Sequence, residues 1–109
     1  MKDGSSMENF NVTLLGNFRI SIDNYPVDGL KSAKTQLLLG YLFLHPLISH
    51  PRRQIAFRLW PESSESQAMA NLRNLLFSLK RAFPRIDQIL DFQTHSIQLR
   101  RDLNFQVDV

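Results

Sequence analysis

The longest helical pattern in the sequence runs from Ser63 to Arg85. Apolar side chains recur there with the alternating three- and four-residue spacing of one buried helix face, at Met69, Leu72, Leu75, Leu76, Leu79 and Phe83. Ser64, followed three residues later by Gln67, has the spacing of a capping box, which satisfies free N–H groups at a helix start. Pro84 ends the pattern because proline lacks the N–H group that a helix needs. The sequence therefore predicts an amphipathic helix over residues 64–83.

The side of this helix that faces away from the apolar stripe is polar but carries few charges. Its residues are Gln67, Ala70, Asn74, Phe77, Ser78 and Arg81, with Asn71 and Arg73 at the edges. Amides, hydroxyl groups and cations are the groups that proteins use to read base edges and to hold phosphates. An ordinary amphipathic helix with a solvated outer face is the simpler interpretation, and the helix taken alone favours it.

Residues 11–23 alternate between apolar and polar side chains, with the two-residue period of half-buried strands. The pair Gly16-Asn17 interrupts this alternation, which predicts two short strands. The run from Asp23 to Pro26 has the composition of a turn, and Val27 begins a third short strand. Together these segments predict an N-terminal antiparallel β-meander.

Two further helices are predicted between the meander and the long helix. The segment 32–45 begins with Ser32, whose hydroxyl group suits a helix N-cap, and from Leu37 to Leu44 it is apolar on nearly all sides, apart from Gly40 and Tyr41. A strand also fits the apolar run Leu37–Leu44, but the length of the segment and its end before a proline favour a helix. Such a helix is expected to be central and covered on more than one side. The next helix begins at His50-Pro51, because proline suits a first helical turn, and it ends before Pro61.

Two short apolar–polar runs follow Pro84 and flank a polar tip at Gln93–Ser96, which predicts a β-hairpin. A very short strand is also expected at Leu47-Ile48. The order of elements is then strands, three helices and a hairpin, with a tight connection between the second and third helices. This order predicts an α+β winged helix-turn-helix. In that fold the third helix enters the major groove, and the hairpin, or wing, touches the backbone or the minor groove.

Length and charge are consistent with this interpretation. The 109 residues fit one domain, the net charge is +3, and nine of the 13 cations are arginine, which suits phosphate and guanine contacts. The lack of cysteine excludes a disulfide framework, a thiolate nucleophile and a Cys-based zinc site. Since no apolar stretch reaches the roughly 18 residues of a membrane span, we expect no membrane contact.

No catalytic or metal-binding pattern is visible. The four glycines are scattered and form no phosphate-binding loop. His45, His50 and His95 lie in separate segments, without the spacing of metal ligands. Asp87 and Asp91 fit solvated loop positions. We therefore expect a protein that is not an enzyme and that uses no metal or cofactor.

Several segments, taken together, resemble one protein family. They are LLGNFRISID, KTQLLLGYLFLH, HPRRQIAFRLWPESSESQAMANLRNLLFSLKRAFP, and ILDF followed by IQLRRD. The family is the DNA-binding domain of the SARP-type (antibiotic regulatory protein) bacterial transcriptional activators, a branch of the OmpR-type winged helices. The most specific part is LWPESSESQAMANLRNLLFSLKRAF, where a Leu-Trp pair, an acidic-serine connection and an Asn-Leu-Arg helix follow one another. The resemblance covers residues 11–103.

The resemblance implies a function and a domain organisation. The chain is expected to bind double-stranded DNA sequence-specifically, as the N-terminal domain of a cytoplasmic bacterial transcriptional regulator that acts as an activator. Residues 1–10 would be a disordered tail, residues 11–103 the winged-helix domain, and residues 104–109 the start of a linker. The linker would lead to a C-terminal helical-repeat domain of the same longer chain. RNA polymerase is the further partner that such a regulator implies.

The resemblance also implies roles for particular residues. The base-reading residues of the outer helix face would be Asn71, Asn74 and Ser78. The phosphate contacts would fall on Lys34, Arg52, Arg73, Lys80, Arg81 and Arg100, the first two of them near helix starts that can hold phosphates. The tip of the wing would be Thr94 and His95.

Phe77 on the outer face leaves three interpretations open. Its ring can contact a thymine methyl group, enter an interface with another protein, or pack under the hairpin. The chain also departs from the family pattern, because its outer helix face carries fewer arginines and its hairpin tip has neither arginine nor glycine. These features motivate the alternative of a winged-helix protein–protein interaction module that has lost DNA binding.

Overall fold

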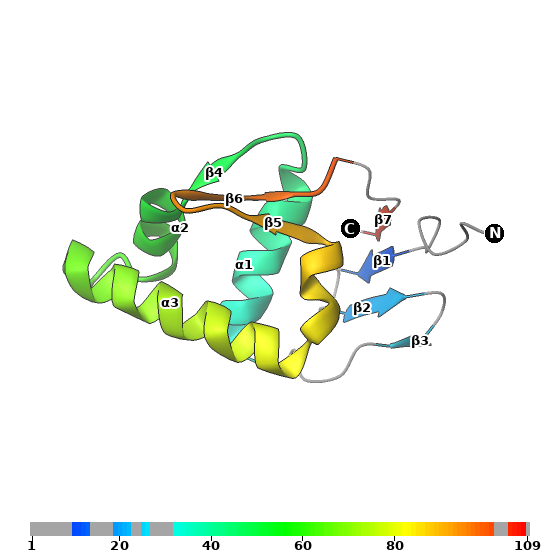
Figure 1. Cartoon of the computed structure of the whole chain (residues 1–109), viewed down its shortest axis with the longest axis horizontal. Coiled ribbons are helices and arrows are strands. Elements are labelled where there is room, and N and C mark those ends of the chain that lie inside the picture. The colour runs from blue at the N-terminus through cyan, green and yellow to red at the C-terminus, as the bar shows by residue number, and fades with distance from the viewer. Residues whose placement is uncertain (1–9, 14–18, 23–24, 27–31, 102–104, 109) are drawn as a thin grey trace.

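The computed structural model describes residues 10–13, 19–22, 25–26, 32–101 and 105–108. Within these ranges the chain is an α+β structure with three α-helices and two small sheets (Figure 1). The elements in chain order are β1 (Phe10–Thr13), β2 (Arg19–Ile22), β3 (Tyr25–Pro26), α1 (Ala33–Leu44), β4 (His50–Pro51), α2 (Arg52–Leu59), α3 (Glu65–Ala82), the 3-10 helix η2 (Pro84–Gln88), β5 (Leu90–Phe92), β6 (Ser96–Leu99) and β7 (Phe105–Asp108).

The first sheet has the strand order β3-β2-β1-β7. Strands β1, β2 and β3 pair antiparallel in sequence order, which confirms the predicted meander. The third strand lies at Tyr25–Pro26, so this pair belongs to the sheet and the prediction of a turn there was wrong. The strand predicted to begin at Val27 falls outside the described residues.

Strand β7 corrects the prediction for the C-terminal residues. Phe105–Asp108 pairs in parallel with β1, with Phe105 opposite Phe10 and Val107 opposite Val12. This segment is too short to form an element alone, and the backbone hydrogen bonds of β1 provide the partners that it needs. Residues 105–108, which were predicted to belong to the start of a linker, are therefore part of the first sheet, which also includes Phe10 from the predicted tail.

Helix α1 confirms the predicted helix and excludes the strand alternative. The Ser32 hydroxyl group accepts a hydrogen bond from the Thr35 N–H at 3.4 Å, as expected for an N-cap. Leu38, Leu39, Leu42 and Phe43 are buried. Helix α1 packs against α2, α3 and β6, as expected of a helix covered on more than one side, but Leu37 is 58% exposed and Leu44 is 55% exposed, so one side remains open.

Helix α2 begins one residue later than predicted. Pro51 precedes the helix and forms strand β4 with His50, which lies opposite Ile97 of β6. The Arg52 N–H donates to the carbonyl oxygen of His95 at 2.9 Å. Residues 50 and 51 therefore form the edge strand of the second sheet, and α2 begins directly after them. Residues 47 and 48, which were predicted to form the short strand, lie in a turn with exposed side chains.

Helix α3 has the predicted bounds within one residue at each end. The Ser64 hydroxyl group accepts a hydrogen bond from the Gln67 N–H at 3.1 Å and caps the helix start. Gln67 Nε2 donates to Asn71 Oδ1 at 2.8 Å, along the helix surface. The helix ends at Ala82, ahead of Pro84.

The predicted hairpin is confirmed and belongs to the second sheet, which has the order β4-β6-β5. Phe92 of β5 lies opposite Ile97 of β6, and the Gln93 N–H donates to the Ser96 carbonyl oxygen at 2.9 Å near the tip. The 3-10 helix η2, between α3 and β5, was not predicted. It buries Ile86 and so adds to the core.

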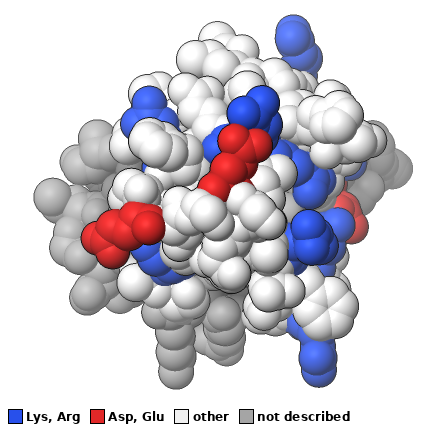
Figure 2. All heavy atoms as spheres, turned by 90° about the vertical axis from the view of Figure 1, so that its left-hand side faces the viewer, with Lys and Arg blue, Asp and Glu red and all other residues white. Residues whose placement is uncertain are grey.

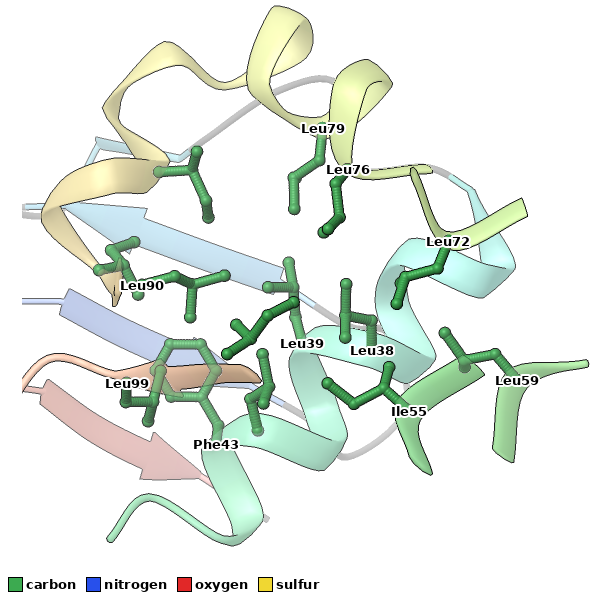
Figure 3. Close-up of a cluster of buried hydrophobic side chains, with 14 of the residues drawn as sticks. Leu38, Leu39, Phe43, Ile55, Leu59, Leu72, Leu76, Leu79, Leu90 and Leu99 are labelled. Carbon is green, nitrogen blue, oxygen red and sulfur yellow. The ribbon is translucent and has the colours of Figure 1, made fainter. Parts of the chain in front are cut away.

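One hydrophobic core connects the helices and the two sheets (Figure 3). Its side chains come from α1, α2, α3, η2 and the hairpin, and Ile20 of β2 joins them, which ties the first sheet to the helices. Leucines of α3 point towards Leu38 and Leu39 of α1. The buried face of α3 therefore packs in the core, and its opposite face is accessible to solvent or a partner. None of the described helices is both long and apolar enough to cross a bilayer.

Candidate nucleic-acid interface

The outer face of α3 is exposed and mostly polar along the helix. Ala68, Leu72, Leu76 and Leu79 are buried, whereas the residues on the other side are exposed: Arg73, Asn74, Phe77, Ser78, Lys80 and Arg81. Beyond Glu65 the helix contains three cations and no acidic residue. This face therefore suits an anionic partner.

The three predicted base-reading residues lie together. Asn71, Asn74 and Ser78 line one shallow depression, which the start of α1 and the end of α2 complete with Ser32, Lys34 and Trp60. Asn74 and Ser78 are exposed, and Asn71 is half-buried. Because Asn71 Oδ1 accepts the hydrogen bond from Gln67, Asn71 offers its NH₂ group to a partner.

Gln67 was predicted to complete a capping box with Ser64, but its side-chain amide donates to Asn71. It precedes Asn71 by four residues, which is the helical spacing at which amide side chains meet. Its hydrogen bond holds the Asn71 side chain in one orientation. The spacing of these two amides was the signal in the sequence that could have identified the pair.

Lys34 is half-buried and has contacts within the fold. Its Nζ donates to the carbonyl oxygen of Leu59 and lies 5.5 Å from the centroid of the Trp60 ring. A cation at the last carbonyl groups of a helix is favourable because these groups carry partial negative charge. Lys34 therefore links the start of α1 to the end of α2. This contact was not predicted from the sequence.

Arg52 lies where α2 meets the hairpin. Its backbone N–H donates a hydrogen bond to the His95 carbonyl oxygen at the hairpin tip, and its side chain is half-buried. The Arg52 Nε atom is buried, with no hydrogen-bond partner among the described residues. The side chains of Thr94 and His95 are exposed, so the start of α2 and the hairpin tip form one surface.

The cations near the end of α3 contact aromatic rings. Lys80 Nζ lies 4.3 Å from the centroid of the Phe92 ring, which places it between α3 and β5. The Arg81 guanidinium carbon lies 5.7 Å from the centroid of the Phe77 ring. Phe77 is 62% exposed, so the interpretation that its ring packs under the hairpin was wrong.

Arg100 is separate from the other predicted phosphate contacts. Its Nε donates to the Asp87 carbonyl oxygen, and its backbone N–H donates to the Ile89 carbonyl oxygen at 2.9 Å. It follows β6 at the end of the hairpin away from the tip (Figure 1). The structure thus groups Asn71, Asn74, Ser78 and Lys34 at one flank of α3, places Lys80 at the other flank, and leaves Arg100 outside.

Positive charge does not cover this end of the molecule evenly. In Figure 2, Lys and Arg side chains gather along the right-hand half of the view, and the larger acidic patches lie at the centre and left. Glu65 at the start of α3 forms an ion pair with Arg53 of α2 at 3.0 Å, with both side chains exposed. This pair offsets one negative charge that would otherwise repel a phosphate beside the helix start.

Among the residues that the structure describes, no three His, Cys, Asp or Glu side chains are placed to hold a metal ion. No protein-family model, curated protein or solved structure matches the chain. The family resemblance therefore rests on the sequence segments quoted above.

Proposed function

We propose that this chain is a winged-helix domain that binds double-stranded DNA sequence-specifically, with α3 in the major groove. The order α1, β4, α2, α3 and hairpin, with β4 paired to β6, is compatible with such a domain. The observation that carries the proposal is the exposed outer face of α3. Beyond Glu65 this helix holds two arginines, a lysine and an exposed asparagine, and no carboxylate.

The dimensions of α3 agree with this role. Its 18 residues correspond to a length of about 27 Å, and the major groove admits an α-helix. An asparagine can form two hydrogen bonds with adenine, and an arginine can do so with guanine. In the proposed complex Asn74 and Ser78 read bases, with Asn71 beside them. Arg73 and Arg81 hold phosphates or a guanine edge, and the hairpin tip approaches the neighbouring backbone.

The proposal also includes the biological setting that the sequence resemblance implies. The domain would belong to a bacterial transcriptional activator, and it would act by binding, without catalysis. RNA polymerase and a C-terminal helical-repeat domain would be its protein partners. These assignments are supported by the resemblance alone.

Salt dependence of DNA binding tests the proposal. A binding site is first selected from random duplexes, and its affinity is then measured by fluorescence anisotropy over a range of salt concentrations. Contact with about 4–6 phosphates predicts a log–log slope of roughly −4 to −5. Equal affinity for a scrambled duplex, or a flat salt response, would overturn sequence-specific DNA binding.

A variant of Asn74 makes this test specific for α3. Asn74→Ala is expected to change the selected sequence at one or two positions, because the base edge that Asn74 contacts loses its hydrogen-bond partner. Gln88→Ala removes another exposed amide, outside α3, and serves as the matched control. Identical site preferences for both variants would show that Asn74 does not read the bases.

The alternative is a protein–protein interaction module built on the same scaffold. Two exposed phenylalanines favour it, since Phe57 is 67% exposed and Phe77 is 62% exposed. In this case selection enriches no duplex, and Asn74→Ala leaves the weak binding of any duplex unchanged. The selection experiment thus separates the two functions.

A further inference from the structure

A groove lies between α1 and α2, apart from the proposed DNA contacts. It has a volume of about 210 Å³ and is lined by Leu37, Leu38, Tyr41, Ile55, Arg58 and Leu59. None of these residues belongs to α3 or to the hairpin, so the groove does not depend on the proposed DNA contacts. Five of its six lining side chains are apolar or aromatic.

An apolar stripe on α1 extends this groove. Leu37, Tyr41 and Leu44 follow one another at four- and three-residue spacing and therefore lie on one side of the helix. Leu37 and Leu44 are more than half exposed, whereas Leu38, Leu39 and Leu42 fill the core from the other side. The fold thus does not need this stripe for its own packing. A continuous exposed apolar surface of this kind is typical of an interaction site.

The charges around the groove indicate what kind of partner fits. Helices α1 and α2 contain four cations and no acidic residue. Lys34 is bound to the Leu59 carbonyl oxygen, and Arg53 is paired with Glu65. Arg58, at the rim of the groove, has no ion pair with any described residue. Its guanidinium carbon lies 5.0 Å from the centroid of the Tyr41 ring, which holds the cation beside the apolar surface.

We propose that the α1–α2 groove docks an acidic amphipathic helix of a partner protein. Apolar side chains of that helix contact Leu37 and Tyr41, and one of them enters the groove. A carboxylate beside it pairs with Arg58. This is the helix-in-groove mode of recognition, in which apolar anchors recur at helical spacing. The volume of the groove suits single side chains, since it is smaller than the roughly 300–1,000 Å³ of a small-molecule site.

Charge argues against a second copy of this chain as the occupant. Two copies docked through the same surface would place an Arg58 side chain from each copy in one interface. Juxtaposed like charges disfavour association. An acidic partner gains from the same cations, which also speed its approach.

Two synthetic peptides test the proposal on the complete 109-residue chain. Both are about 18 residues long, which allows helix formation, and carry leucines at the same helical spacing. One has glutamates beside the leucines and the other has lysines. Affinity is measured by anisotropy of labelled peptide, and the contact surface by changes in backbone amide chemical shifts. The acidic peptide is expected to bind about tenfold more tightly, with the largest shifts at Leu37, Tyr41 and Arg58.

Three variants identify the groove as the site. Arg58→Glu is expected to reverse the preference, so that the lysine peptide binds more tightly. Leu37→Gln weakens the acidic peptide about tenfold, the effect of losing an anchor residue at an interface. Leu47→Gln is the matched control, because Leu47 is 89% exposed and does not line the groove. Thermal unfolding followed by circular dichroism verifies that all three variants fold.

Several results would overturn the proposal. Equal binding of the two peptides would exclude charge recognition, and shifts centred on Phe77 would move the site to α3. Sedimentation that shows a dimer dissolved by Leu37→Gln would make a second copy the occupant. An unchanged preference in the Arg58→Glu variant would remove Arg58 from the interface.

Discussion

Phe77 is an exposed aromatic residue on the outer face of α3. Its ring is exposed at the middle of α3, one helical turn before Arg81, whose guanidinium group lies against it. The contact with Arg81 orients the ring while leaving it accessible. Under the proposed function, this places an apolar surface next to cations in the major groove, where thymine methyl groups are the apolar features of the bases.

Removing thymine methyl groups tests this role of Phe77. In the selected duplex, deoxyuridine in place of thymine is expected to weaken binding about fourfold at the contacted position, because a buried methyl group contributes about 0.8 kcal/mol. The Phe77→Ala variant is expected to bind both duplexes equally. Anisotropy titrations of the four combinations measure the coupling. A loss of the same size in the wild-type chain and in the variant would assign methyl recognition to another residue.

At the scale of a single element, α3 has to present its outer face in a fixed orientation. Its start is held by the Ser64 cap and by the ion pair between Arg53 and Glu65. The cap satisfies an N–H group of the first turn, and the ion pair ties α3 to α2. Exposed ion pairs contribute little to stability, so the cap is the stronger of the two.

Ser64→Ala is expected to lower the free energy of unfolding by about 1 kcal/mol, since alanine cannot accept the hydrogen bond from the Gln67 N–H. Urea denaturation followed by circular dichroism measures the change. Ser64→Asp should retain most of the stability, because aspartate is also a good N-cap. Ser66→Ala replaces an exposed serine of the same turn and should stay within about 0.5 kcal/mol of the wild type. Equal losses for Ser64→Ala and Ser66→Ala would contradict the capping role.

At the scale of the whole molecule, the two sheets and the helices share one core. Ile20 in β2 is 1% exposed and packs with the buried side chains of the helices. Strand β7 binds to β1, so the last described residues return to the first sheet. The first sheet is therefore expected to unfold together with the rest of the chain.

Ile20→Ala tests this cooperativity. It is expected to cost about 2–4 kcal/mol, because it removes buried methyl groups and leaves a cavity in the shared core. Circular dichroism and the fluorescence of Trp60, the single tryptophan, should report one coincident transition in urea. Ile48→Ala is the control, since Ile48 is 53% exposed and should change stability little. A Trp60 transition unaffected by Ile20→Ala would show that the first sheet is an independent unit.

Local patterns in the sequence were sufficient to predict most of the elements. The spacing of leucines in α3, the serine caps of α1 and α3, and the alternation in β5 and β6 each involve residues a few positions apart. Their structural consequence follows from helix or strand geometry alone. The composition of the outer face of α3 was visible for the same reason. The start of α2 was displaced because Pro51 serves a strand that pairs with a distant segment, and the third strand and the short strand before α2 were also misplaced.

The sequence by itself therefore determined the three helices, the hairpin and the polar character of α3. Tertiary structure decided which groups of these elements have partners. Lys34 reaches Leu59, Arg52 holds His95, and β7 pairs with β1, and all of these contacts join segments that are distant in sequence. It also left Leu37 and Phe77 exposed, although both are apolar residues in helices. The physical reason is that periodicity reports the geometry of one element, whereas burial depends on which other elements pack against it.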